Sequence, residues 1–180
     1  MRKLIPLAAV VAALAAFAAC PAAAMTPGQM ECPAQLAPKN LGPLLTQAMI
    51  DYKEGEPQNP EITKGVKLVL EACIKREKVA ANQEDAYLKY VIARVSHDDL
   101  RRQLGAMKVP TAVLDRVFGL GPGLRNPLPD QIAEDEFNTL VSELKAAGIE
   151  LDSLPKNAIT MMGAYVAITG EVYRAMAAVR

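Results

Sequence analysis

The chain has 180 residues, and its 20 basic and 20 acidic side chains leave no net charge at neutral pH. Aromatic residues make up only 4% of the sequence, and tryptophan is absent. Nucleic-acid-binding proteins usually carry a basic stripe and stacking aromatic side chains, so this composition argues against that class. Alanine, leucine and methionine must fill most of the core, which suits packed helices better than a β-sandwich.

The first 24 residues have the pattern of an export signal. Arg2 and Lys3 form a short positive start, an uncharged run follows as far as Ala19, and small residues precede Met25. The uncharged run is shorter than the roughly 20 residues that a membrane-spanning helix needs. We therefore expect residues 1–24 to be a cleaved signal peptide and the protein to be periplasmic or secreted. A retained membrane anchor is the less favoured alternative.

Cys20 offers a second processing route. Residues 16–20, Ala-Phe-Ala-Ala-Cys, resemble a bacterial lipoprotein box, in which the cysteine is lipidated and becomes the first mature residue. Phe17 stands where leucine is usual in such a box, so cleavage before Met25 is the interpretation we favour. Lipidation of Cys20 is the alternative. It would anchor in the cell envelope a mature chain in which we otherwise expect no membrane-spanning segment.

Residues 25–40 hold three prolines and a glycine, and we expect them to form an extended arm. Cys32 lies in this arm, and Cys73 lies in a later helix. An even pair of cysteines in an oxidising compartment predicts a disulfide between them. Two distant cysteines and a single histidine make a poor zinc set, so no metal or other cofactor is expected.

From residue 41 to residue 180, apolar residues recur at helical spacing. The fold class we expect is therefore all-α: a compact bundle of about six helices forming one domain, with the extended N-terminal arm and one disulfide. Ser96 and Asp99 resemble a capping box and would kink or divide the third helix. The expected helices cover residues 43–54, 60–79, 82–107, 110–118, 131–147 and 156–179.

Particular residues are expected to fix helix ends and helix contacts. Asn59 and Asp130 are placed to cap the helices that follow them, and Gly148 is placed to end one. In the closing helix, Gly163 and Gly170 lie on a stripe of small residues, with Ala167 between them. We expect another helix to pack closely against this stripe.

Residues 119–130 read Gly-Leu-Gly-Pro-Gly-Leu-Arg-Asn-Pro-Leu-Pro-Asp and form the least regular stretch of the domain. The glycines are not a phosphate-binding loop, because no lysine followed by serine or threonine completes that motif. A plain surface connection is the interpretation we favour. The functional alternative is a binding loop that displays Leu120, Leu124, Arg125 and Leu128.

No catalytic residue is predicted. His97 is the only histidine, and its neighbours Ser96, Asp98 and Asp99 cannot form a Ser-His-Asp relay, because adjacent side chains on a helix diverge. Helix capping explains these residues without a reaction. Two-carboxylate hydrolysis stays formally open, since acidic residues such as Glu134 are plentiful.

Two short segments are similar in pattern to the small periplasmic acid-stress chaperones. These segments are Glu31-Cys32 followed by Leu36, and Val-Leu-Glu-Ala-Cys at 69–73, so the similarity covers residues 31–80. Those chaperones are helical, with one disulfide that joins an early cysteine to a later helix. The resemblance implies a holdase function.

The sequence is thus compatible with three functions. The first is an exported, non-catalytic helical module that binds a protein or another component of the cell envelope. The second is an envelope hydrolase that uses carboxylates, which a deep pocket holding two acids or His97 would favour. The third is a periplasmic holdase-type chaperone. A shallow apolar groove near residues 119–130 would favour the first.

Overall fold

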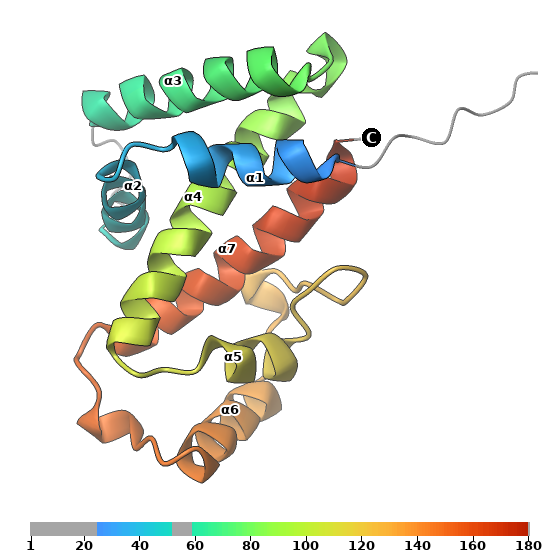
Figure 1. Ribbon diagram of the computed structural model, residues 1–180. Coiled ribbons are helices and arrows are strands. Elements are labelled where there is room, and N and C mark those ends of the chain that lie inside the picture. The colour runs from blue at the N-terminus through green and yellow to red at the C-terminus, as the bar shows by residue number, and fades with distance from the viewer. Residues whose placement is uncertain (1–24, 52–58, 180) are drawn as a thin grey trace, which may run out of the picture.

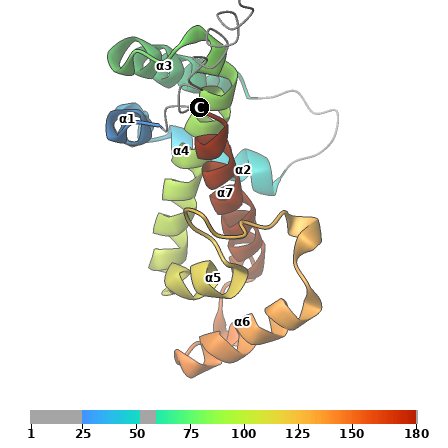
Figure 2. The ribbon, with the colours of Figure 1, turned by 90° about the vertical axis from the view of Figure 1, so that its right-hand side faces the viewer.

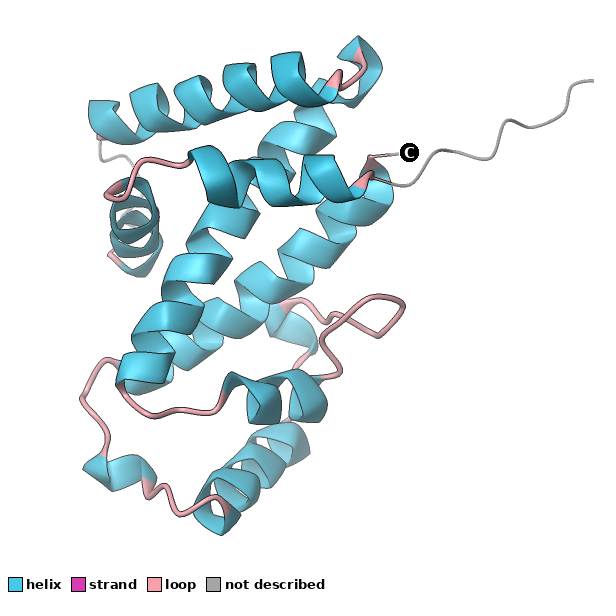
Figure 3. Cartoon of the chain, viewed as in Figure 1, coloured by secondary structure: helices cyan, strands magenta, loops and turns pink. Residues whose placement is uncertain are grey.

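A computed structural model of the protein describes residues 25–51 and 59–179 (Figure 1). Throughout these ranges the regular structure is helical, which confirms the all-α prediction (Figure 3). The α-helices are α1 (Pro27–Leu36), α2 (Leu41–Ile50), α3 (Pro60–Glu77), α4 (Glu84–Ala106), α5 (Thr111–Phe118), α6 (Glu134–Ala146) and α7 (Ala158–Ala178). Short 3-10 turns are η2 (Ala81–Gln83), η3 (Pro129–Gln131) and η4 (Leu151–Ser153). The expected signal peptide, with Cys20, lies outside the described residues.

The two longest helices, α4 and α7, run antiparallel through the molecule and connect two hydrophobic cores (Figure 1). The first half of α4 and the end of α7 pack with α1, α2 and α3, and Tyr87 and Val91 are buried there. The second half of α4 and the start of α7 pack with α5 and α6, where Leu100 and Leu104 are buried. Both cores therefore depend on the same pair of helices.

The expected extended arm is wrong, because residues 27–36 form helix α1. Thr26 caps this helix: its side chain accepts a hydrogen bond from the Gln29 amide, and the Gln29 side chain accepts one from the Thr26 amide. Pro27 occupies the first turn, where its missing N–H costs nothing. The local caps therefore outweigh the proline content that predicted an extended chain.

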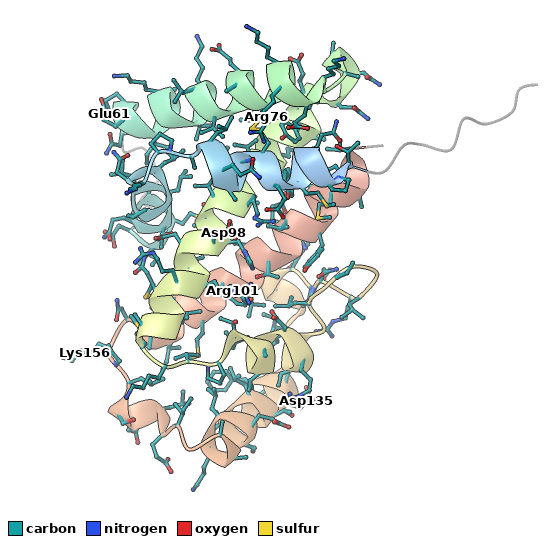
Figure 4. All side chains as sticks on the ribbon, viewed as in Figure 1. Glu61, Arg76, Asp98, Arg101, Asp135 and Lys156 are labelled. Atoms are coloured by element: carbon teal, nitrogen blue, oxygen red, sulfur yellow. A yellow bond between two sulfur atoms is a disulfide. The ribbon has the colours of Figure 1, made fainter. Side chains whose placement is uncertain are left out.

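The predicted disulfide between Cys32 and Cys73 is present and joins α1 to α3, with Cα atoms 5.8 Å apart (Figure 4). Both cysteines are fully buried in the first core. The hydroxyl groups of Tyr87 and Tyr90 on α4 donate to the carbonyl oxygens of Gln29 and Met30, at 2.9 Å and 2.8 Å. Helix α1 is thus held covalently on one side and by two hydrogen bonds on the other.

Several expected helix boundaries hold and others do not. Asn59 caps α3, since its side chain accepts from the Glu61 amide at 3.0 Å. Helix α4 runs through residue 96 without a break, and the Ser96 hydroxyl donates back to the Ile92 carbonyl, so it caps no new helix. Asp130 lies in η3, and α6 begins four residues later at Glu134.

The closing helix α7 corrects one packing expectation. A side chain at Gly170 would meet the carbonyl oxygen of Pro127 at 3.2 Å, so that part of the small-residue stripe is covered, though by a loop. At Gly163 an added methyl group would meet nothing within 4 Å, so the expected close helix contact is absent there. In the described ranges, no helix combines the length and apolar character that crossing a membrane requires.

Candidate functional site

A cleft of about 220 Å³ lies between α1, α4 and α7. Figure 1 shows α1 passing across the pair formed by α4 and α7. Most of the cleft wall is apolar or aromatic, and the polar groups come mainly from α4. The residues that line it are Pro27, Met30, Glu31, Tyr90, Arg94, His97, Thr169, Val172, Tyr173 and Met176.

One carboxylate holds the two basic side chains of the cleft. Arg94 Nε donates to Asp98 Oδ2 at 2.9 Å, and His97 Nδ1 lies 3.2 Å from Asp98 Oδ1. Burial by itself would raise the pKa of Asp98, but the hydrogen bonds from His97 and Arg94 outweigh it and hold that pKa below its ordinary value. Asp98 is therefore an anion that fixes both neighbours.

The imidazole of His97 is fixed a second time by an aromatic ring. Its centroid lies 5.3 Å from that of the Tyr165 ring on α7. His97 was interpreted from the sequence as part of a helix cap, but α4 continues for nine residues beyond it. The structure instead places His97 in the wall of the cleft.

Helix α1 supplies the opposite wall of the cleft. Glu31 Oε1 lies 3.9 Å from Arg94 Nη2, which is too long for a hydrogen bond. The hydroxyl of Tyr90 donates to the carbonyl of Met30 and thereby fixes this wall to α4. Burial raises the pKa of Tyr90 above its ordinary value, which keeps the hydroxyl protonated as the donor.

The polar groups of the cleft differ in whether they already have a partner within the protein. The Thr169 hydroxyl donates to the Tyr165 carbonyl at 2.7 Å and is committed to its own helix. Among the lining residues, no thiol or aliphatic hydroxyl is directed at His97 as a nucleophile. Arg94, in contrast, is a cation that Asp98 holds in the wall of the cleft.

The four residues that the alternative of a binding loop would display do not share one surface. Leu120 is buried in the second core, whereas Leu124 and Leu128 are exposed. Arg125 pairs with Glu136 at the start of α6. The loop is thus part core and part surface.

Asn126 gives this loop a fixed shape. Its backbone is left-handed, with φ at 47°, and its side chain bonds both the amide and the carbonyl of Gly121, at 2.9 Å and 2.7 Å. Arg174 on α7 donates to the Asn126 carbonyl at 2.9 Å. The loop is therefore ordered against α7.

The acidic residues of the described chain form no candidate metal centre. No group of three or more histidine, cysteine, aspartate or glutamate side chains comes together in residues 25–51 and 59–179. Glu136 accepts a hydrogen bond from the Ala133 amide at 3.0 Å and so caps α6, while Glu134 is exposed on the same turn. A first-turn carboxylate of this kind stabilises a helix.

Comparison with known proteins adds no further residue to the site. No protein-family model, no curated protein and no solved structure matches the chain. The similarity in pattern to acid-stress chaperones therefore stays an expectation based on residues 31–80.

Proposed function

We propose that the protein is an exported, non-catalytic helical module that binds a protein or another component of the cell envelope. The cleft between α1, α4 and α7 is its ligand site. One observation carries this proposal: Arg94 and His97 are both held on Asp98, within 3.2 Å, in the wall of an otherwise apolar cleft. Groups that are ordered before a ligand arrives lose little conformational freedom on binding, which favours affinity.

The rigidity of α1 supports the same function. This helix forms one wall of the cleft, and the disulfide and two tyrosine hydroxyls hold it in place. The Tyr87 hydroxyl also supplies the hydrogen bond that Pro33 cannot donate to the Gln29 carbonyl, so the same contacts stabilise the helix and fix the wall that it forms. A wall that cannot move keeps the cleft open between binding events.

A fragment screen by NMR tests the binding proposal. Small anionic, cationic and neutral compounds are added to the ¹⁵N-labelled, disulfide-bonded protein, and perturbed amides are mapped. We expect hits to perturb the lining residues of α1, α4 and α7. A smaller hollow of about 150 Å³ lies between α2 and α3, lined in part by Leu41 and Leu68. Hits that gather there instead, or no hits at all, would overturn the assignment of the site.

Export is tested separately by mass spectrometry of the protein purified from cells. The expected N-terminus is Met25, as the small residues at 22–24 provide the cleavage site. A diacylated Cys20 at the N-terminus would instead establish the lipoprotein route. An N-terminus at Met1 in the cytoplasmic fraction would contradict export altogether.

An envelope hydrolase is the second candidate, since His97 and Asp98 are in contact beside a cleft. A histidine held by an aspartate can act as a general base on water. The test compares hydrolysis of chromogenic esters and peptides by the parent protein and by His97→Gln. Turnover that disappears in the variant would favour the hydrolase over the binding module.

A further inference from the structure

We infer that the cleft binds a carboxylate that carries a short apolar group, with the carboxylate paired to Arg94. This inference rests on the proposed function, because it uses the same cleft. It adds the chemical class of the ligand, its orientation and the part of the protein with which it competes.

The first step is the state of the Arg94 guanidinium. Its Nε donates to Asp98 Oδ2 at 2.9 Å, and its Nη2 lies 3.9 Å from Glu31 Oε1, which is beyond hydrogen-bond distance. The Arg94 side chain is only 24% exposed and lines the cleft beside Tyr90. The planar guanidinium of an arginine matches the two oxygens of a carboxylate, so a ligand carboxylate can take the place of the loosely held Glu31.

The second step is the character and size of the remaining wall. Met30 on α1 and Val172 and Met176 on α7 line the cleft with carbon and sulfur atoms. Its volume of about 220 Å³ is below the roughly 300–1,000 Å³ of pockets for drug-sized ligands. The ligand portion that enters is therefore small and apolar, such as a short acyl chain or a single aliphatic side chain.

The third step concerns Glu31, which stands where the ligand carboxylate would pair. Its side chain is 56% exposed and can turn into solvent, since its contact with Arg94 is longer than a hydrogen bond. Until it turns away, its charge repels an incoming anion. Removal of this charge should therefore strengthen the binding of a carboxylate and weaken the binding of an amine.

The required chemistry has two natural sources: a short-chain fatty acid and the C-terminus of a peptide that ends in an apolar residue. Hexanoate represents the first source, and N-acetyl-leucine represents the second. N-acetyl-leucinamide has the same shape as the latter without the charge, and hexylamine reverses the charge of the former. NMR titration of the full, disulfide-bonded chain at pH 7 gives a Kd for each probe and the location of its site.

We expect at least one of the two carboxylates to bind in the cleft with a Kd of about 1–10 mM, a typical range for so small a ligand. The stronger of the two identifies the source. When the stronger of the two binds, the NMR signal of the Arg94 Nε–H should shift together with the amide signals of the lining residues. The corresponding uncharged or amine analogue should bind at least about tenfold more weakly, because it cannot pair with Arg94.

Variants give the sharpest test. Arg94→Gln should weaken carboxylate binding at least about tenfold. The Kd of Arg94→Lys should lie between those of the parent and of Arg94→Gln, because lysine keeps the charge but loses the paired donors. Arg101→Gln is the matched control: Arg101 lies two turns farther along α4, is exposed and lies outside the cleft (Figure 4). It should leave the Kd unchanged.

Whether Glu31→Gln strengthens or weakens binding decides the ligand class. Glu31 is exposed, so this test does not require the substitution of a buried residue. Tighter binding of hexanoate or N-acetyl-leucine supports the inference. If hexylamine binds in the cleft and Glu31→Gln weakens it, the cleft is a cation site: the inference fails, but the proposed binding function stands. If the amide binds as well as the acid, the inference also fails. If no probe perturbs the cleft, both proposals are overturned.

Discussion

Tyr165 shows how one hydrogen bond ties two elements of the second core together. Its hydroxyl, on α7, donates to Asp115 Oδ1 on α5 at 3.0 Å. Burial and the negative charge of Asp115 raise the pKa of Tyr165 to about 12. The folded protein therefore favours the protonated hydroxyl more strongly than the unfolded chain does.

This preference predicts a loss of stability in alkali. A tyrosine in the unfolded chain titrates near pH 10, so the contribution of Tyr165 is complete below that pH and is lost as the pH rises toward about 12. Tyr165→Phe should cost about 1 kcal/mol at pH 7 and should reduce the loss between pH 7 and pH 11. Urea unfolding of both proteins at the two pH values measures this. An equal loss in both would contradict the role of Tyr165.

Gly163 provides a second residue-scale prediction. Glycine inside a helix costs up to about 1 kcal/mol relative to alanine, and an added methyl group at this position would meet no atom within 4 Å. Gly163→Ala should therefore raise the free energy of unfolding by up to about 1 kcal/mol. Gly163→Leu should also be tolerated, contrary to what the small-residue stripe led us to expect.

Gly170→Ala is the matched control on the same helix. Its methyl group would lie 3.0 Å from Arg174 Nη1 and 3.2 Å from the Pro127 carbonyl oxygen, so a loop must move to admit it. We expect no gain or a net loss of stability. Urea unfolding of the two alanine variants side by side compares them, and a gain at Gly170 as large as that at Gly163 would refute this account.

At the scale of elements, α1 marks the limit of what the sequence could predict. The signals for its start were present, since Thr26 and Gln29 form a capping box around Pro27. Pro33 argued against a helix, because it cannot donate to the Gln29 carbonyl. In the fold, the Tyr87 hydroxyl donates to that carbonyl instead, and no local pattern could predict a partner 58 residues away.

The sequence could not predict the candidate site, for the same reason. The helix expected over residues 60–79 and the Cys32–Cys73 bond followed from spacing and cysteine count, and both are present. The cleft needs Arg94 and His97 from α4 opposite Glu31 from α1. Because residues 25–40 were expected to form an extended arm, the sequence predicted no helix that could form this wall. The sequence showed that His97 is the only histidine, but it could not show which side chains lie opposite it in the fold.

The disulfide between α1 and α3 should contribute measurably to the stability of the fold. Cys32 and Cys73 are separated by 41 residues, and a closed loop of that length stabilises the fold by about 4 kcal/mol in the chain-entropy model. The double variant Cys32→Ala/Cys73→Ala should lose roughly that amount. Urea unfolding of the variant and of the oxidised parent measures the difference. A loss below about 1 kcal/mol would mean that the α1 contacts to Tyr87 and Tyr90 suffice without the bond.

At the scale of the whole molecule, the two cores differ in how firmly they hold their outer helices. Helix α6 buries only Leu140 and Leu144, and Phe137 on its first turns is 43% exposed. Figure 2 shows α6 at the end of the molecule away from α1, α2 and α3. Helix α3, at the other end, is fixed to α1 by the disulfide. The second core has no covalent bond of this kind among the described residues.

This asymmetry predicts the order in which backbone amides exchange with deuterium. Few buried apolar contacts give a helix a low free energy of local opening, so α6 should exchange before the centres of α4 and α7, which serve both cores. Reduction of the disulfide should speed exchange in α1 and α3 and leave α6 nearly unchanged, because α6 already opens on its own. Hydrogen exchange with mass spectrometry, on oxidised and reduced protein, gives both comparisons. If α6 is as protected as α4, or if reduction accelerates α6 as much as α1, the molecule opens as one unit and the division into two ends of unequal stability is wrong.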